Sequence, residues 1–146
     1  MNSTDNATTS TQEAMHNRIT LPWGLIGFPA FSEAEVVYAE EEWPFLRLRQ
    51  CSPDGGTFLV VRPGSVVPEY APSIADEDML ALGAGNPDEI ELLNIATIHE
   101  TVPRQVTLNL VGPILVNRNN GLARQVVIEN FADYSARHCF FREEDA

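Results

Sequence analysis

The feature that most constrains the fold is that apolar residues occur in short runs separated by glycine, proline and asparagine. Residues 114–117 and 125–128 each contain three consecutive aliphatic residues. They lie on either side of Asn120-Gly121, a pair that tolerates the positive φ angles of a type I′ turn. They predict a β-hairpin. Residues 45–50 alternate leucine with arginine, which is the period of a half-buried strand. Such a pattern favours a sheet with polar and apolar sides.

Further strands are predicted where β-branched and aromatic residues gather, at residues 35–38, 57–61, 90–98 and 105–111. One helix is predicted, with Ser73 as its N-cap, acidic residues in its first turn, an apolar side from Met79, Leu80 and Leu82, and Gly83 or Gly85 at its end. Asn86 and Pro87 predict a single helical turn after it. The expected fold class is mainly β: a small β-barrel-like single domain of about six to eight antiparallel strands with one short helix.

The domain organisation follows from where apolar residues begin. Residues 1–15 are rich in serine, threonine and asparagine, and we interpret them as a disordered N-terminal tail. Residues 16–146 form the single predicted domain, without internal repeats. Residues 21–29 mix large apolar groups with two glycines and two prolines, which indicates a packed loop rather than a regular element.

The charge pattern excludes several functions. The chain has no lysine, nine arginines and 21 acidic residues, so its formal net charge is −12. Schiff-base chemistry and a P-loop both need lysine, and direct nucleic-acid binding needs a cationic surface. A basic or neutral partner is favoured instead. Because we find neither a run of apolar residues long enough to span a membrane nor a signal peptide, we expect a cytoplasmic protein that contacts no membrane.

The residues that could carry chemistry form no catalytic or metal-binding pattern. His138 and Cys139 are adjacent, so in a strand their side chains would point to opposite faces. His99 stands alone, and no zinc-ligand spacing is present. We therefore predict no enzyme activity, no catalytic residues, no metal site and no cofactor. The acidic run at residues 40–42 is interpreted as a solvated loop, whereas the run at residues 76–78 could steer a cationic partner.

Four segments, taken in order, resemble one known family. Residues 21–28, Leu-Pro-Trp-Gly-Leu-Ile-Gly-Phe, are similar to the opening motif of the flagellar assembly factor FliW family. Residues 109–117, 124–127 and 134–138 resemble its later motifs, and the likeness runs from about residue 19 to residue 140. The chain departs from the family pattern at Leu21 and Ile26, and Arg124 replaces a usual lysine. The family's first edge strand is expected to be short or missing.

The resemblance implies a β-barrel-like protein that works by partner switching. Proteins of this family bind flagellin in the cytoplasm and also bind CsrA, the translational repressor of flagellin synthesis, so that flagellin export frees them to hold CsrA. The residues predicted to contact partners are the acidic group and the polar members of the motifs: Asp76, Glu77, Asp78, Asn109, Asn117, Gln125, Arg137 and His138. The alternative is a small-molecule-binding or hydrolytic β-barrel that uses Cys139 or His99, in a deep apolar pocket. The oligomeric state is left open.

Overall fold

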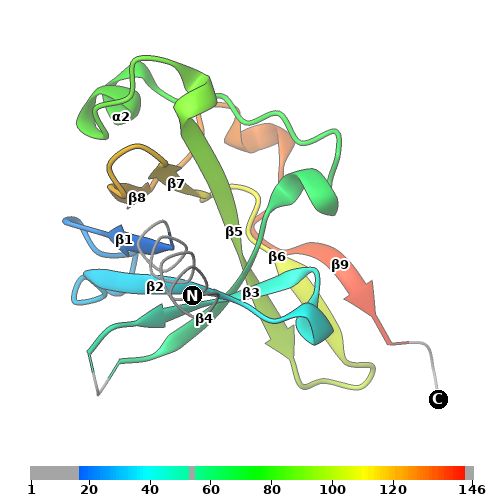
Figure 1. The fold of residues 1–146 in the computed structure, drawn as a ribbon. Helices are drawn as coiled ribbons and strands as arrows, with labels where there is room; N and C mark the ends of the chain where they lie inside the picture. Colours follow the sequence, from blue (N-terminus) through cyan, green and yellow to red (C-terminus); the bar gives the residue numbers. More distant parts are fainter. Residues whose placement is uncertain (1–16, 53–54, 144–146) are drawn as a thin grey trace, which may run out of the picture.

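One antiparallel sheet of nine strands organises residues 17–52 and 55–143, which are the residues that this computed structural model describes (Figure 1). Its strands, in chain order, are β1 Arg18–Thr20, β2 Glu33–Tyr38, β3 Phe45–Gln50, β4 Thr57–Val61, β5 Ile90–His99, β6 Gln105–Leu108, β7 Ile114–Asn117, β8 Ala123–Gln125 and β9 His138–Arg142. Their spatial order is β1-β2-β3-β4-β5-β6-β9, with β7 between β5 and β8. The mainly β prediction is confirmed.

The sheet is open, so the expected barrel-like form is corrected. Among the strands that the structure describes, β1 and β9 stand at the two ends of the order and do not pair with each other. Strand β5 divides the sheet, because residues 90–93 pair with β7 while residues 94–99 run between β4 and β6 (Figure 1). An isolated parallel bridge from Thr20 to Leu122 links β1 to the β7–β8 hairpin. The strand count exceeds the prediction because β1, which has only three residues, and β9 fall in no predicted strand range.

The alternation predicted for residues 45–50 is confirmed in β3. Leu46 and Leu48 are buried, whereas Arg47 and Arg49 are exposed on the other face. Side chains of a strand alternate between the faces of its sheet, so this pattern fixes which face of β3 covers the core. The largest core cluster lies between β1–β5 and the β7–β8 hairpin, and its fully buried members include Leu21, Leu48 and Ile114.

The predicted hairpin is present, but its turn is not of type I′. Asn117 N–H donates to the Leu122 carbonyl at 2.9 Å, so the loop has four residues, 118–121. Gly121 has a φ of +73°, whereas no residue other than glycine has a positive φ in the part of the chain that the structure describes. Asn120 instead accepts the Leu122 N–H through its side chain at 2.9 Å. An asparagine that makes this local bond stabilises a turn without left-handed backbone.

The short helix is present, but its predicted N-cap is wrong. Helix α2 spans Asp76–Ala81 with Ala75 at the N-cap position, and that position makes no side-chain capping bond. Ser73 is occupied elsewhere: its hydroxyl donates to Glu129 Oε1 at 3.0 Å and its N–H to Asn130 Oδ1 at 2.7 Å. Gly83, with a φ of +69°, follows the helix end as expected.

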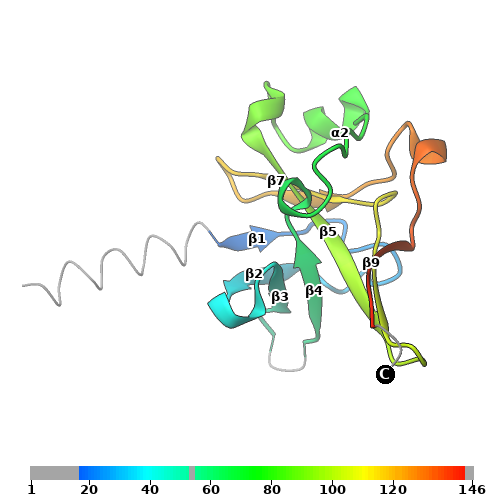
Figure 2. The ribbon, with the colours of Figure 1, turned by 90° about the vertical axis from the view of Figure 1, so that its right-hand side faces the viewer.

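Helix α2 does not pack against the molecule through a buried apolar face. None of its own residues is buried, and Leu80 is 77% exposed although it was assigned to the apolar side. Leu82, the C-cap residue, is fully buried beside Leu115 and Val126. Figures 1 and 2 show α2 above the β7–β8 hairpin, in the long connection between β4 and β5.

That connection also holds the 3-10 turns η2, Pro63–Ser65, and η3, Pro87–Glu89. Asn86 caps η3 by accepting the Asp88 N–H at 2.9 Å, which confirms the predicted helical start. The remaining 3-10 turns are η1, Glu40–Glu42, and η4, Phe131–Asp133. The expected tail, residues 1–15, lies outside the described residues. None of the helices in the described segments is long and apolar enough to cross a membrane.

Candidate functional site

The acidic residues predicted to meet a partner lie at the exposed end of the molecule formed by α2. Asp76 and Glu77 are exposed, and no arginine of the described segments lies within 4 Å of either carboxylate. Asp78 differs from them, because its side chain is only 14% exposed and its Oδ1 lies 3.3 Å from Arg124 Nη1. Two carboxylates therefore face solvent without a neutralising cation, while the third holds the helix to strand β8.

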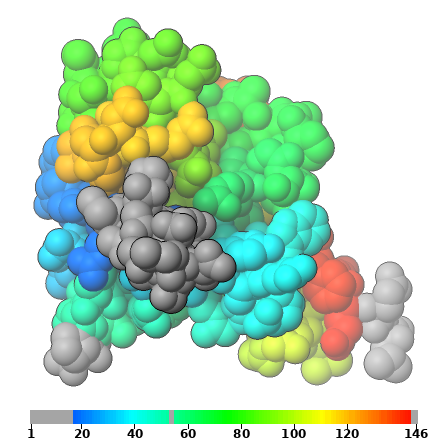
Figure 3. All heavy atoms as spheres, in the orientation of Figure 1, coloured from blue at the N-terminus to red at the C-terminus, as the bar shows by residue number. Residues whose placement is uncertain are grey.

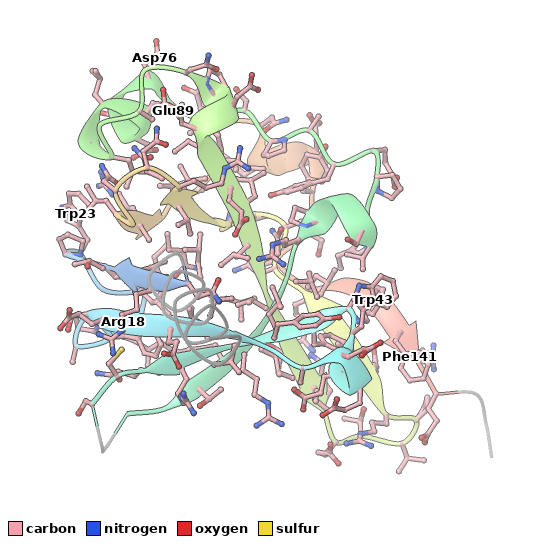
Figure 4. The ribbon with its side chains drawn as sticks, viewed as in Figure 1. Arg18, Trp23, Trp43, Asp76, Glu89 and Phe141 are labelled. Carbon is pink, nitrogen blue, oxygen red and sulfur yellow. The ribbon has the colours of Figure 1, made fainter. Side chains whose placement is uncertain are left out.

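Arg124 links the acidic helix to an exposed aromatic ring. Its guanidinium carbon lies 4.7 Å from the centre of the Trp23 indole, within the range of a cation–π contact. Trp23 is 47% exposed and comes from the loop that follows β1. The planar guanidinium can bind a carboxylate and stack on a ring at once, which a lysine ammonium does less well. Figure 4 shows Trp23 on the same side of the molecule as Asp76.

The loop after β1, residues 21–31, has the special backbone geometry that its sequence predicts. Gly24 has a φ of +66°, and a Cβ there would lie 2.5 Å from the Pro29 carbonyl oxygen. Gly27 has a φ of +86°. Leu25 and Phe28 exchange backbone hydrogen bonds of 3.0 and 2.8 Å. The tight turn buries the side chain of Leu25 and leaves Ile26 59% and Phe28 54% exposed.

Beside this loop lies an apolar groove of about 610 Å³. Phe28 and Phe31 contribute to it from the loop, and Phe58 contributes from β4. The Phe58 ring meets the other two edge to face, with centroid distances of 5.1 and 5.2 Å. Trp23, Ile26, Phe28 and this groove form what we call the apolar loop surface. Exposed apolar patches are common at protein-contact sites, so this surface is a candidate for one.

Three of the predicted site residues hold backbone together. Asn109 Oδ1 accepts the N–H groups of Val111 and Gly112 at 3.1 and 2.9 Å. Gln125 accepts from Ile26 N–H and donates to the Gly112 carbonyl, both at 2.9 Å, so it positions the apolar loop. Asn117 is 1% exposed, and its Nδ2 donates to the Leu82 carbonyl at 2.8 Å.

Arg137 and His138 lie at a different place from the acidic helix. Strand β9, which His138 begins, stands at the end of the sheet order and pairs with β6 (Figures 1 and 2). Arg137 is exposed, and its N–H donates to Ser135 Oγ at 3.0 Å. The structure thus brings Asp78 and Gln125 to one side, through β8 and its neighbours, but does not bring Arg137 and His138 to them.

His99 and Cys139, the residues on which the alternative of a small-molecule-binding or hydrolytic barrel depends, do not line the groove described above. His99 Nε2 is 2.8 Å from Thr107 Oγ1, on the inner strands of the sheet. Cys139 is exposed, and its thiol lies 3.8 Å from the Phe141 carbonyl. Across residues 17–52 and 55–143, no three histidine, cysteine, aspartate or glutamate side chains gather as a metal-binding group. These side chains do not build the deep apolar pocket that the alternative needs.

The sequence predicts a packed loop at residues 21–29, and it gives no sign of the contacts that join Arg124 to Asp78 and Trp23. Arg124 lies in one of the segments that carry the family resemblance. Its partners come from segments about 45 and 100 residues away along the chain, which no local pattern reveals. The space-filling view shows the hairpin residues lying against the α2 segment (Figure 3).

Comparisons with known proteins agree on one family. A family model described as FliW protein matches residues 2–140. The flagellar assembly factor FliW of Clostridium botulinum is 31% identical over 127 residues, covering 87% of this chain and 89% of that protein. The FliW of Desulfitobacterium hafniense is 36% identical over 132 residues, covering 88% and 83%.

The fold agrees with this assignment. The crystal structure of a flagellar assembly factor FliW superposes with a TM-score of 0.76, covers 88% of each chain and is 24% identical in sequence. At that identity the superposition shows a shared fold. Together with the matched family model and the relatives above 30% identity, it leads to one conclusion: this chain belongs to the family of flagellar assembly factors FliW.

Proposed function

We propose that this protein binds flagellin and a CsrA-type translational regulator in the cytoplasm, and that it acts by binding alone. In this scheme flagellin occupies the protein until it is exported, after which the free protein holds the regulator and flagellin translation resumes. Family membership supports the assembly role. The observation that supports binding of the regulator is a pair of exposed carboxylates on α2, Asp76 and Glu77, which no arginine of the described residues neutralises.

The charge argument concerns how a basic regulator would reach the protein. An RNA-binding protein carries cations that neutralise phosphates, so a chain of net charge −12 attracts it. At physiological ionic strength that attraction extends over roughly 8 Å, so the carboxylates nearest the contact matter most. Exposed interfacial charges act chiefly on the association rate. Asp76 and Glu77 would therefore accelerate encounter rather than hold the complex.

The apolar loop surface would supply the holding contacts. Ile26 and Phe28 are more than half exposed on a loop that Gly24, Gly27 and the Gln125 amide keep in one conformation. A preorganised apolar surface loses little conformational entropy on binding. In this proposal Asn109, Asn117 and Gln125 contribute by fixing the loops, whereas Arg137 and His138 provide a separate contact area at the start of β9.

The role of the two carboxylates is tested by measuring binding rates with purified regulator and purified flagellin from the same genome. The double variant Asp76→Asn, Glu77→Gln is expected to lower the association rate of the regulator by about three- to tenfold at low salt, and much less at high salt. The matched control is Glu69→Gln, Asp133→Asn, which removes two exposed charges elsewhere. Equal effects of the two pairs would refute the placement on α2, and binding of neither protein would refute the proposed function.

The role of the apolar loop surface is tested by truncating exposed side chains, because such truncations leave the fold intact. Ile26→Ala is expected to raise the dissociation rate of at least one partner by about tenfold. Val102→Ala is the matched control, because Val102 is fully exposed on the turn between β5 and β6. A dissociation rate that is unchanged by Ile26→Ala for both partners would show that the loop is not the contact.

A further inference from the structure

The register of β8 places the Arg124 side chain on the side of the sheet that carries α2. Arg124 stands opposite Leu115 on β7, and directly opposite residues of an antiparallel pair have their side chains on the same face. Leu115 is buried in one cluster with Leu82, the residue that ends α2. Gln125, the next residue of β8, stands opposite Ile114 of the largest core cluster, so it lies on the other face.

The Arg124 guanidinium contacts two groups that come from distant parts of the chain. Its Nη1 lies 3.3 Å from Asp78 Oδ1, and its central carbon lies 4.7 Å from the centre of the Trp23 indole. The side chains of Arg124 and Asp78 are 32% and 14% exposed, and both values are lower than the corresponding ones in every other ion pair of the described segments. Solvent therefore screens this pair less than the others.

Trp23 has a fixed backbone, but its ring is open to solvent. Gly24 N–H donates to the carbonyl of Leu21 at 2.9 Å, and Leu21 is fully buried, so the chain is held on both sides of Trp23. Trp23 itself is 47% exposed, and it takes part in none of the ring–ring contacts of the described segments. Two side-chain dihedral angles set the direction of an indole. The stacked guanidinium favours one direction, and it can do so while it binds a carboxylate.

We propose that Arg124 is a positioning residue that holds the Trp23 ring in the orientation a partner meets, and that Asp78 holds Arg124 in place. The acidic helix and the apolar loop surface are then coupled, because a change at Asp78 reaches Trp23 through one side chain. A cation–π contact at a partly exposed site favours the held orientation by about two- to fivefold. That the ring contacts a partner rests on the proposed function, whereas its dependence on Arg124 and Asp78 does not.

The orientation of the ring is tested in the free protein by the fluorescence of Trp23. Every variant, and the reference protein, carries Trp43→Phe, which leaves Trp23 as the one tryptophan of the chain. Arg124→Gln is expected to reduce the population of the held orientation by about two- to fivefold, seen as lower fluorescence anisotropy and faster quenching by acrylamide. Asp78→Asn should shift both quantities in the same direction by less, because the guanidinium remains. Arg124→Lys should fall between the reference and Arg124→Gln, because it keeps the charge without the planar group.

The matched controls remove an ion pair at another place. Arg104 Nη2 lies 2.9 Å from Glu100 Oε1, and both residues lie around the turn between β5 and β6. Arg104→Gln and Glu100→Gln change the net charge by the same amounts as the two test substitutions. They should leave the anisotropy and the quenching of Trp23 unchanged. Equal quenching in Arg124→Gln and Arg104→Gln would overturn the positioning role, and unchanged fluorescence in Asp78→Asn would overturn the coupling to α2.

The use of the ring in binding is tested with the regulator and flagellin of the proposed function. Arg124→Gln should raise the dissociation constant of a partner that contacts Trp23 by at most about fivefold, because only the fraction of competent protein changes. Trp23→Ala should weaken the same complex at least as much. If a partner binds the wild type and both variants equally tightly, Trp23 is not part of the contact. If neither protein binds the wild type, the proposed function fails, and the fluorescence result still decides the role of Arg124.

Discussion

Asn117 offers the sharpest test of how the acidic helix is held to the sheet. It is the last residue of β7 and 1% exposed. Its Nδ2 donates to the Leu82 carbonyl at 2.8 Å, and its Oδ1 accepts the Asn119 N–H at 2.9 Å. One buried amide thereby joins the end of α2 to the hairpin loop, and its removal should disturb both.

The cost of Asn117→Ala follows from these contacts. Two hydrogen bonds are lost at about 1 kcal/mol each, and the space left by the amide adds about 1 kcal/mol. The Leu82 carbonyl keeps a partial partner, because Asn120 Nδ2 lies 3.2 Å away. The expected loss in the free energy of unfolding is therefore about 2–3 kcal/mol, or a melting temperature roughly 5–10 °C lower for a domain of this size.

Urea denaturation of Asn117→Ala and of the control Asn120→Ala measures this difference. Asn120 is exposed, so its truncation should cost about 1 kcal/mol or less. Asn117→Asp tests the donor itself, because a buried carboxylate facing the Leu82 carbonyl has no proton to donate. Burial would raise the folded-state pKa of the new carboxyl group. The loss in the free energy of unfolding relative to wild type should therefore be largest at neutral pH and should shrink as pH falls. Equal losses for the two alanine variants, or a deficit independent of pH, would refute this reasoning.

Three further outcomes are expected. Gly24→Ala should lower the free energy of unfolding by about 2–4 kcal/mol, because φ is +66° and a Cβ would lie 2.5 Å from the Pro29 oxygen; a melting temperature within about 2 °C of wild type would contradict this. Tyr70→Phe should cost about 1 kcal/mol near neutral pH, because the hydroxyl donates to a carbonyl at 2.6 Å. Burial raises the pKa of Tyr70, so the unfolded chain ionises first, and the wild-type advantage should fall above about pH 10 in urea denaturation. The hydrogen bond from Arg47 lowers the pKa of Glu42, so this pair stabilises the fold at neutral pH, and the stabilisation is lost as pH falls through that lowered pKa. In the variant Arg47→Gln, the NMR titration midpoint of Glu42 should rise, and an unchanged midpoint would contradict this prediction.

Sequence patterns predicted the parts of the fold that depend on neighbouring residues. The alternation at residues 45–50 and the run at residues 57–61 identify β3 and β4 with their observed bounds. The hairpin at Asn120-Gly121 was also found, because glycine at the end of that loop is a local requirement. The turn type was wrong, since Asn120 uses its side chain to accept a backbone N–H rather than adopting a positive φ.

What the sequence could not show depends on residues that are distant along the chain. Ser73 is a good capping residue in isolation, but its hydroxyl and N–H are bonded to residues 129 and 130. The roles of Asn109 and Gln125 likewise depend on which backbone groups face them. The open form of the sheet is set by β5, whose halves pair with different strands, and a pattern of apolar residues does not specify pairing.

The attachment of α2 has a consequence for how such a protein can diverge. Because none of the helix's own residues is buried, most of its surface is free of packing constraints, and its position depends on Asp78, Leu82 and the residues that contact them. Substitutions at the outward positions leave the stability of the domain almost unchanged. Mutation can therefore change the outward residues of this helix without first having to compensate for a weakened core.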